Sequence, residues 1–434
     1  MHLFDVVAFL IFLSGLFIFV NTFYLKMPTS LGLMILTMLL SFTVMIIGHM
    51  FPRFHIAEHV KAFDFRDVLN QVVISVILFA GGLQMNMKKL GDLKLTVILL
   101  SIFSAILSTV VIGSLIYGVL HLVNLEVSYL YSLVFGAVIS STDPISAANI
   151  TGNFSIPKKL SIKVEGESLF NGAFSVVLAF VLYHVMMVSE GHEMILMEVT
   201  RVVSIEILGG VAIGIGMGYI GYLILNYIDN EDMHIEVLIT IALVMVGSFI
   251  SEYFNIYSKL VALIMGLMIG NLGRVDQKNP DERGVVNGYV YKFWKLMEQT
   301  MAVLLFVLMG LEILVLEWRM DYFSVGFIAV NLVWFGRWLS IYIPVKIMSM
   351  TVSFDKDTVS VMTWGAFKGG LPIALILALD PFAGKELMIT MTYVVVVCSI
   401  LFQGFTLPIM MKEKFLTGAV RRTTGGRGMK KHFS

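Results

Sequence analysis

The chain has 434 residues, of which 58% are hydrophobic and only 14% charged, and its mean hydropathy is +0.89. Soluble domains carry about 25% charged residues, so a soluble enzyme, a nucleic-acid-binding domain and a disordered chain are excluded. Thirty basic and thirty acidic residues leave no net charge, so the overall charge indicates no partner.

Long apolar runs predict helices that cross the hydrocarbon core of a membrane, which takes about 20 residues each. The composition therefore predicts an all-α polytopic membrane protein, with a membrane domain at 1–411 and a short basic tail at 412–434. Thirteen spans are expected, at residues 4–24, 29–51, 68–87, 95–122, 128–151, 163–188, 202–227, 235–252, 257–273, 290–315, 322–350, 357–380 and 387–411.

The distribution of basic residues predicts the orientation, because cytoplasmic loops carry an excess of Lys and Arg. With thirteen spans and the C-terminus inside, twenty basic residues fall in inner segments and seven in outer loops. This count places Lys163 in an inner loop and Lys259 in an outer one. We therefore expect an outside N-terminus, a cytoplasmic C-terminus and a location in the cytoplasmic (inner) membrane.

Two of the expected spans are interrupted in their middles. The fifth contains Ser-Ser-Thr-Asp-Pro at 140–144, and the twelfth contains Lys-Gly-Gly-Leu-Pro at 368–372. Interrupted helices at corresponding places in two halves of a chain indicate a transporter built from inverted repeats, with its ion site near the midplane.

Asp143 is the first candidate for an ion-binding residue. A carboxylate deep in a membrane helix is costly and marks a functional site by default. Pro144 disfavours helix at Asp143 and frees nearby carbonyls, which with the Thr142 hydroxyl suit a small cation. A buried aspartate that caps the following half-helix is the structural alternative, and it is compatible with ion binding.

Further charges lie within the expected spans. Glu167 and Asn171 share a helix face, whereas Glu165, near the helix start, is expected to be mainly structural. Arg337 is the expected partner of Glu167, because each is otherwise an unpaired buried charge. Lys368 either compensates the ends of the half-helices or extends its ammonium to the inner surface.

STDP at 141–144 followed by GESLFN at 166–171 resembles the cation/proton antiporter-1 family, the NhaP-type and NHE-type sodium/proton exchangers. Further matches, in family order, are LFAGGLQMNMKKL (78–90), LMIGN (267–271), FVLMGLEI (306–313), Arg337, TWGAFKGG (363–370) and FQGFTLP (402–408). The resemblance implies a thirteen-helix inverted-repeat fold, usually a homodimer, in which the fifth and twelfth spans cross as broken helices. It implies exchange of Na⁺ (or Li⁺ or K⁺) for H⁺ by alternating access, and hence a role in pH homeostasis.

The resemblance also assigns residues. Thr142, Asp143, Ser168 and Asn171 match the family's cation site, and Glu167 with Arg337 matches its structural ion pair. Lys368 stands where the family usually has arginine.

The main departure is Gly172, which stands where the family has the aspartate of an Asn-Asp pair. That carboxylate binds cation and proton in alternation, so its absence leaves two interpretations. Either another acid, Asp143 or Glu167, couples the two ions, or the chain is a transport-impaired variant, natural or engineered; we favour impairment.

A non-transporting sensor or scaffold and an uncoupled cation leak are the alternative functions. No cofactor, no metal beyond the transported cation and no nucleic-acid partner is expected. The basic tail is expected to be a positive-inside anchor, with contact to anionic lipid headgroups as the alternative.

Overall fold

The computed structural model describes residues 3–27, 29–50, 68–125, 127–143, 147, 156–189, 196–228, 233–254, 256–272, 288–314 and 319–411, all of them helical or in short connections. In chain order the elements are α1 (Leu3–Val20), η1 (Asn21–Leu25), α2 (Thr29–Met50), η2 (Val68–Val73), α4 (Ile74–Gln84), α5 (Met87–Leu90), η3 (Gly91–Leu93), α6 (Lys94–Leu122), α7 (Tyr129–Ser140), α9 (Lys158–Ser189), α10 (Leu196–Tyr227), α11 (Met233–Tyr253), α12 (Ser258–Leu272), α13 (Gly288–Glu312), α14 (Met320–Met348), α15 (Thr358–Trp364), α16 (Leu371–Ala378), α17 (Lys385–Cys398), η4 (Ser399–Gln403) and α18 (Gly404–Met411).

The expected fold class, an all-α polytopic membrane protein, is confirmed. Each of the thirteen expected ranges contains helix. Within the described residues, eight helices are long and apolar enough to cross a membrane, and four shorter apolar helices accompany them. The count of thirteen spans stays a prediction. The tail at 412–434 and Pro144 lie outside the described residues.

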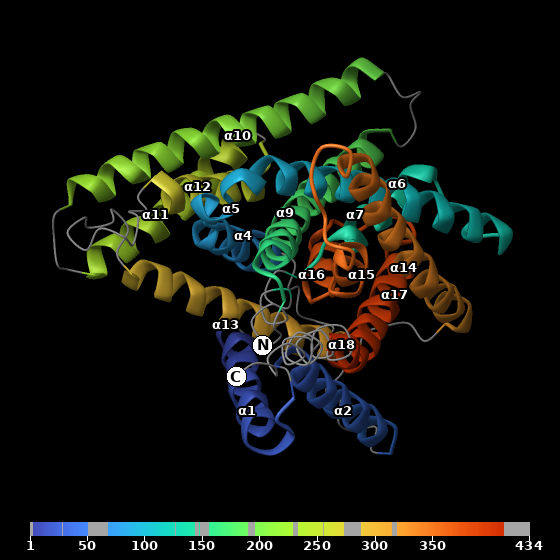
Figure 1. Cartoon of the computed structure of the whole chain (residues 1–434). Helices are drawn as coiled ribbons and strands as arrows, with labels where there is room; N and C mark the ends of the chain where they lie inside the picture. The colour runs from blue at the N-terminus through green and yellow to red at the C-terminus, as the bar shows by residue number, and fades with distance from the viewer. Residues whose placement is uncertain are drawn as a thin grey trace, which may run out of the picture.

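The interrupted helices lie at the centre of the molecule. In Figure 1, α7, α9, α15 and α16 occupy the middle, with α6, α14 and α17 on one side and α4, α11 and α12 on the other, while α10 runs along an edge. Two large clusters of buried hydrophobic side chains pack these helices together. One joins α1, α2, α7, α14, α16 and α17, and the other joins α4, α10, α11, α12 and the first half of α13.

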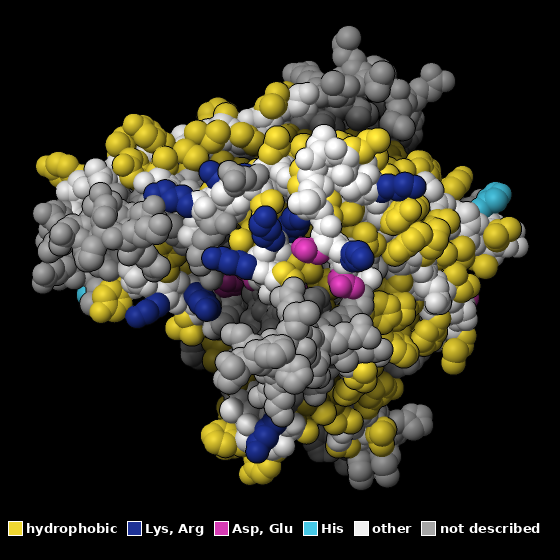
Figure 2. Space-filling view, viewed as in Figure 1, with side chains coloured by type: hydrophobic (Ala, Val, Ile, Leu, Met, Phe, Trp, Pro, Cys, Tyr) yellow, Lys and Arg dark blue, Asp and Glu magenta, His cyan; other side chains and the backbone are white. Residues whose placement is uncertain are grey.

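The outer rim of the molecule is apolar, as a lipid-facing surface requires. Large hydrophobic side chains such as Leu208, Phe249, Phe327 and Ile347 are exposed there. Figure 2 shows hydrophobic side chains along the rim, whereas basic and acidic side chains gather toward the middle of the face turned to the viewer. Exposed apolar surface on this scale is unfavourable in water and suits a hydrocarbon environment.

Two lysines lie deeper than the sequence predicted. Lys163 belongs to α9, is 2% exposed, and donates from Nζ to the Ser353 carbonyl oxygen at 2.9 Å. Lys259 lies in the first turn of α12, buried against the Phe180 and Tyr257 rings. Their assignment to loops was wrong, because both lysines lie in the first turns of helices, α9 from Lys158 and α12 from Ser258, where their long side chains pack against neighbouring residues.

Helices α4 and α12 approach so closely that their contact requires glycine. A Cβ atom on Gly266 would lie 2.3 Å from the Phe79 carbonyl oxygen, and one on Gly270 would lie 2.2 Å from that of Leu83. Small residues at such crossings let helix backbones pack directly, which is a main source of helix association in membranes. This contact fixes α4 against α12 and thereby positions Gln84 at the end of α4.

This contact predicts that Gly266→Ala destabilises the protein, because the new methyl group would collide with backbone rather than with a flexible side chain. Gly216→Ala in α10 is the matched control, since a Cβ atom there meets nothing within 4 Å and alanine is favoured over glycine in a helix by about 1 kcal/mol. Thermal unfolding of the purified proteins in detergent should show a lower Tm for Gly266→Ala only. Equal Tm values for the two variants would contradict the close contact.

Candidate functional site

The chain leaves helical geometry at Ser141, in the middle of the expected fifth span. Helix α7 ends at Ser140, and the backbone of Ser141 is extended, with φ −57° and ψ 140°. The N–H of Ala147, which is helical, donates to the Asp143 carbonyl oxygen at 3.2 Å. A short non-helical segment at 141–143 therefore separates α7 from the helical residue beyond it.

A second interruption separates α15 from α16, at residues 365–370. The two interruptions touch, because the Asp143 N–H donates to the Phe367 carbonyl oxygen at 3.0 Å. A Cβ atom on Gly369 would lie 3.0 Å from the Asp143 Cβ and 3.1 Å from its Oδ2. The structure therefore brings the two expected broken helices together, with the Asp143 side chain at their crossing.

Lys368 compensates the end of α7 rather than reaching the surface. Its side chain is 2% exposed, and Nζ donates to the carbonyl oxygens of Ser140 and Ser141, each at 3.3 Å. The last carbonyls of a helix have no intrahelical partner and carry partial negative charge. Of the two interpretations left open by the sequence, compensation of the half-helix end is the one the geometry supports.

Polar side chains from α9 line the other side of the interruption. The Thr142 hydroxyl donates to the Ser168 carbonyl oxygen, and Asn171 donates from Nδ2 to the Thr142 Oγ1 and the Ser140 carbonyl oxygen, each at 3.1 Å. Thr142, Ser168 and Asn171 are buried, whereas Asp143 is partly exposed. The Ser168 hydroxyl is buried without a hydrogen-bond partner in the described part of the chain, an unsatisfied group that needs an explanation. An oxygen-seeking ligand such as a small cation supplies one.

Gly172 lies so close to the interruption that a side chain there would displace the backbone slightly. A Cβ atom there would lie 2.8 Å from the Thr142 carbonyl oxygen. A carboxylate at this position therefore requires a shift of the α7 end or of α9 by a few tenths of an ångström. In this chain glycine lets the two backbones approach and leaves the Thr142 carbonyl without an acidic neighbour on that side.

Glu167 and Arg337 form a buried, bidentate ion pair. Arg337 Nη1 lies 2.9 Å from Glu167 Oε1 and Nη2 lies 2.8 Å from Oε2, and the side chains are 2% and 3% exposed. The Ser104 hydroxyl accepts a further hydrogen bond from Arg337 Nη1 at 2.8 Å. The pair joins α9 to α14 through α6, so the structure brings these two predicted residues together. Glu165, in contrast, is exposed and accepts a hydrogen bond from the Ser161 hydroxyl.

Three buried carboxylates were not singled out from the sequence, namely Glu206, Glu236 and Glu298. Glu298 in α13 is 6% exposed and accepts a hydrogen bond from the Gln84 side chain at 2.5 Å. Glu206 in α10 is 7% exposed and lies 2.7 Å from His184 Nδ1. An acidic residue inside an apolar run was the available signal in all three cases. Among the described residues no group of three His, Cys, Asp or Glu forms a metal cluster.

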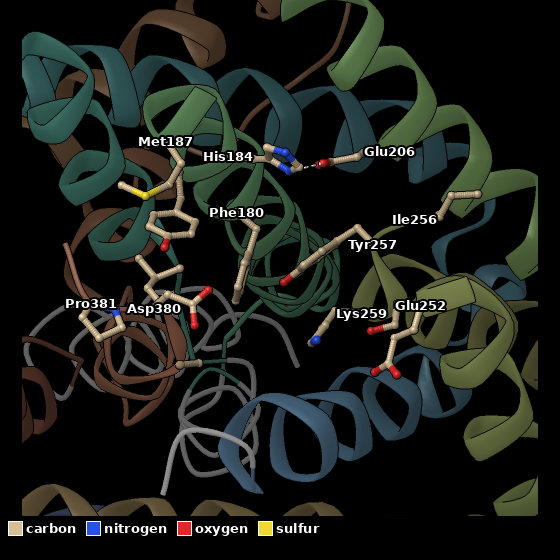
Figure 3. A pocket seen from close by; sticks show the side chains of 14 residues that line it. Phe180, His184, Met187, Glu206, Glu252, Ile256, Tyr257, Lys259, Asp380 and Pro381 are labelled. Carbon is tan, nitrogen blue, oxygen red and sulfur yellow. Dashed lines mark ion pairs between the residues drawn. The ribbon is translucent and has the colours of Figure 1, made fainter. Parts of the chain in front are cut away.

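Glu206 lines a pocket of about 730 Å³ between α9, α10, α12 and the segment after α16. Figure 3 shows Glu252, Tyr257 and Lys259 on one side of this Glu206 pocket and Asp380 on the other, with the His184–Glu206 pair at its edge. The pocket lies toward the end of α9 opposite Lys158. Its three acidic side chains outnumber its single lysine, so it favours cations over anions.

The chain is similar to known membrane transporters over nearly its whole length. A family model described as sodium/hydrogen exchanger, transmembrane, matches residues 6–413. The Na(+)/H(+) antiporter NhaP of Pseudomonas aeruginosa is 29% identical over 97% of this chain and 99% of its own length. The Na(+)/H(+) antiporter NhaH of Halobacillus dabanensis is 27% identical over 90% of this chain and 92% of its own.

The fold is shared with a solved structure. The sodium proton antiporter MjNhaP1 of Methanocaldococcus jannaschii at pH 8 superposes with a TM-score of 0.75 at 18% identity, covering 96% of this chain and all of that one. At this identity the likeness concerns the fold.

The buried ion pair predicts that Glu167→Gln or Arg337→Met alone lowers the free energy of unfolding by about 3–5 kcal/mol, because each leaves an unpaired buried charge. The double substitution should be less destabilising than either single one. Thermal unfolding in detergent measures both effects, and Arg319→Met, which removes the exposed pair with Asp321, serves as a control with little effect. A double variant less stable than both single variants would contradict this account.

Proposed function

The chain belongs to the sodium/hydrogen exchanger family, and from that premise we propose that it exchanges sodium ions for protons across its membrane by alternating access. It is a multi-pass membrane protein of a transporter family, not an enzyme. The observation that carries the proposal is the crossing of the two interrupted helices at Asp143. Relatives named as Na(+)/H(+) antiporters, similar over nine tenths or more of their length, support it.

We propose that the cation binds at the Asp143 carboxylate, with oxygens from Thr142, Ser168 and Asn171. Hard oxygen ligands suit small cations, and the freed carbonyls of the interruption add to them. The hydrogen bonds among Thr142, Ser168 and Asn171 hold these oxygens in place before the ion arrives. The same ligand set also suits Li⁺ and K⁺, to which we extend the proposal, with no resident cofactor.

Neutralising charges are part of the proposed mechanism. Lys368 stabilises the end of α7, and Glu167 with Arg337 keeps α9 and α14 in register. The site then moves with these helices as one body while the cluster around α4 and α10–α13 stays in place. The acid-rich Glu206 pocket, which lies on one side of α9, would give cations a path from that side of the membrane.

We also propose the organisation that the family implies. The membrane domain covers residues 1–411, the basic tail at 412–434 is cytoplasmic and touches lipid, and the N-terminus is outside the cytoplasm. Two copies form a homodimer in the cytoplasmic membrane. The excess of basic residues in the expected inner segments supports this orientation.

Gly172 implies that exchange is impaired relative to a site with two adjacent carboxylates. One negatively charged ligand is missing, so sodium binding is weaker. We propose a slow exchanger with low sodium affinity. A non-transporting sensor would instead bind sodium without flux, and an uncoupled leak would pass sodium regardless of the proton gradient.

We expect Asp143→Asn to reduce exchange to the rate of empty vesicles, because the amide keeps the shape of the site but carries no charge. The measurement is sodium-driven proton movement in vesicles that contain the purified chain, followed with a pH-sensitive dye. Asp321→Asn is the control, since Asp321 lies in an exposed pair with Arg319. Exchange by Asp143→Asn at the rate of the unaltered protein would refute the assignment.

The missing ligand predicts a difference between Gly172→Asp and Gly172→Asn. Both must displace the Thr142 carbonyl equally, so the comparison isolates the charge. Hydrogen bonds and contacts to a charged group contribute about 1.5–3 kcal/mol, so sodium affinity should be roughly tenfold or more higher with aspartate. Vesicle exchange should rise in parallel and be independent of membrane voltage. Equal affinities in the two variants would show that position 172 does not face the ion.

A further inference from the structure

Glu298 is a carboxylate buried within the membrane part of the protein. It lies in the middle of α13, where 6% of its surface is exposed. Gln84, at the end of α4, donates from Nε2 to Glu298 Oε2 at 2.5 Å and to the Ala80 carbonyl oxygen at 3.2 Å. The amide therefore holds the carboxylate in a fixed position, and α4 is itself fixed against α12 by the glycine contacts described above.

Among the described residues, no basic side chain forms an ion pair with Glu298, unlike the pairs His184–Glu206, Arg319–Asp321 and Glu167–Arg337. The charged groups that interact electrostatically with Glu298 are Asp143 and, one turn away on its own helix, Lys295. A buried carboxylate held by a neutral amide is costly when ionised. Binding of a proton or of a cation removes that cost.

Asp143 is near enough to Glu298 for the two carboxylates to repel each other. Helix α13, which carries Glu298, packs beside the second interruption, because it contacts α16 and a Cβ atom on Gly370 would lie 3.0 Å from the Leu305 Cβ. The neighbouring Gly369 faces Asp143, since a Cβ atom there would lie 3.1 Å from Asp143 Oδ2. Two carboxylates that repel each other in a low-dielectric site are stabilised when they share one proton. A monovalent cation bound between the two carboxylates neutralises the same single negative charge as the shared proton does.

The site leaves little room for a second acid on the α9 side. At position 172 a side chain would collide with the Thr142 carbonyl. On the α13 side, in contrast, a carboxylate is present, buried and oriented by Gln84. Helix α13 belongs to both large packing clusters, since its first half packs with α4, α10, α11 and α12 and its second half packs in the cluster that contains α7 and α16.

We propose that Glu298, positioned by Gln84, is the second carboxylate of the cation site, and that it shares with Asp143 either one sodium ion or one proton. This inference rests on the proposed exchange at Asp143. Two carboxylates with one Na⁺ and the same two with one H⁺ both carry a net charge of −1. Each cycle therefore moves one Na⁺ against one H⁺ without net charge transfer, and the competition for the pair couples the two fluxes.

The test measures proton release on sodium binding, which does not require transport. Sodium chloride is titrated into the purified full chain in detergent, in buffers of different ionisation enthalpy, and calorimetry gives the protons released per bound sodium. The unaltered protein should release about one proton per bound sodium ion. Its sodium affinity should fall by up to about tenfold for each unit by which the pH is lowered, because protons compete for the same site. Glu298→Gln should release less than a third as many protons and show a weaker pH dependence.

Glu386→Gln is the matched control, because Glu386 is an exposed glutamate in the first turn of α17; it should behave as the unaltered protein. Proton release and pH dependence unchanged in Glu298→Gln would overturn the inference. The proposed function would still stand if Asp143→Asn lost sodium binding. Absence of sodium binding by the unaltered protein would refute the proposed function itself.

Gln84→Met provides a second test, which can be used if Glu298→Gln does not fold like the unaltered protein. Elution in gel filtration and the Tm show whether it does. Removing the amide donor destabilises the ionised carboxylate, so the pH at which sodium affinity is half its maximum should rise by about one unit. Proton release per sodium should persist, because the carboxylate remains. A purely structural role of Gln84 would lower the Tm without moving that pH, and this result would overturn the role assigned to the Gln84–Glu298 pair.

Discussion

Two interrupted helices meet inside an apolar layer, and the rest of the structure depends on satisfying the backbone groups that they expose. A free N–H or C=O costs several kcal/mol in hydrocarbon, so an interruption persists only where protein surrounds it. Here the Asp143 N–H pairs with the Phe367 carbonyl, Asn171 pairs with the Ser140 carbonyl, and the Lys368 N–H pairs with the Ser399 hydroxyl. The partners come from α9 and from η4, which explains why these helices surround the crossing.

The charges follow from the same constraint. The end of α7 presents carbonyls that attract a cation, and the Lys368 side chain occupies that position. In the proposed exchange, the mobile cation binds at the adjacent Asp143. Glu167 and Arg337 neutralise each other nearby, so they add rigidity without adding net charge. The proposed site thus combines these fixed groups with Asp143, the acid at which the cation and the proton exchange.

Glu298 changes the meaning of Gly172. Judged from α9 alone, the glycine removes a coupling acid and indicates impaired transport. The structure places a further buried carboxylate on α13, within electrostatic reach of Asp143, and a second acid lets a proton and a cation compete for the site without a carboxylate at position 172. Because Glu298 lies on α13 and Asp143 follows α7, relative movement of these helices would alter the distance between the two acids during exchange.

The sequence by itself determined the all-helical membrane fold, since apolar runs of spanning length leave no other class. It also determined the two interruptions, because helix-breaking residues within apolar runs are local signals, and it predicted the Glu167–Arg337 pair, because two deep charges of opposite sign need each other. The tertiary structure alone decided what depends on distance between remote segments. Only packing shows that Lys368 reaches the end of α7, that Lys163 and Lys259 are buried, that a Cβ atom at position 172 would press on the Thr142 carbonyl, and that Gln84 donates a hydrogen bond to Glu298. These facts join residues that are up to 228 positions apart, and no local pattern in a single sequence specifies which faces of such helices meet.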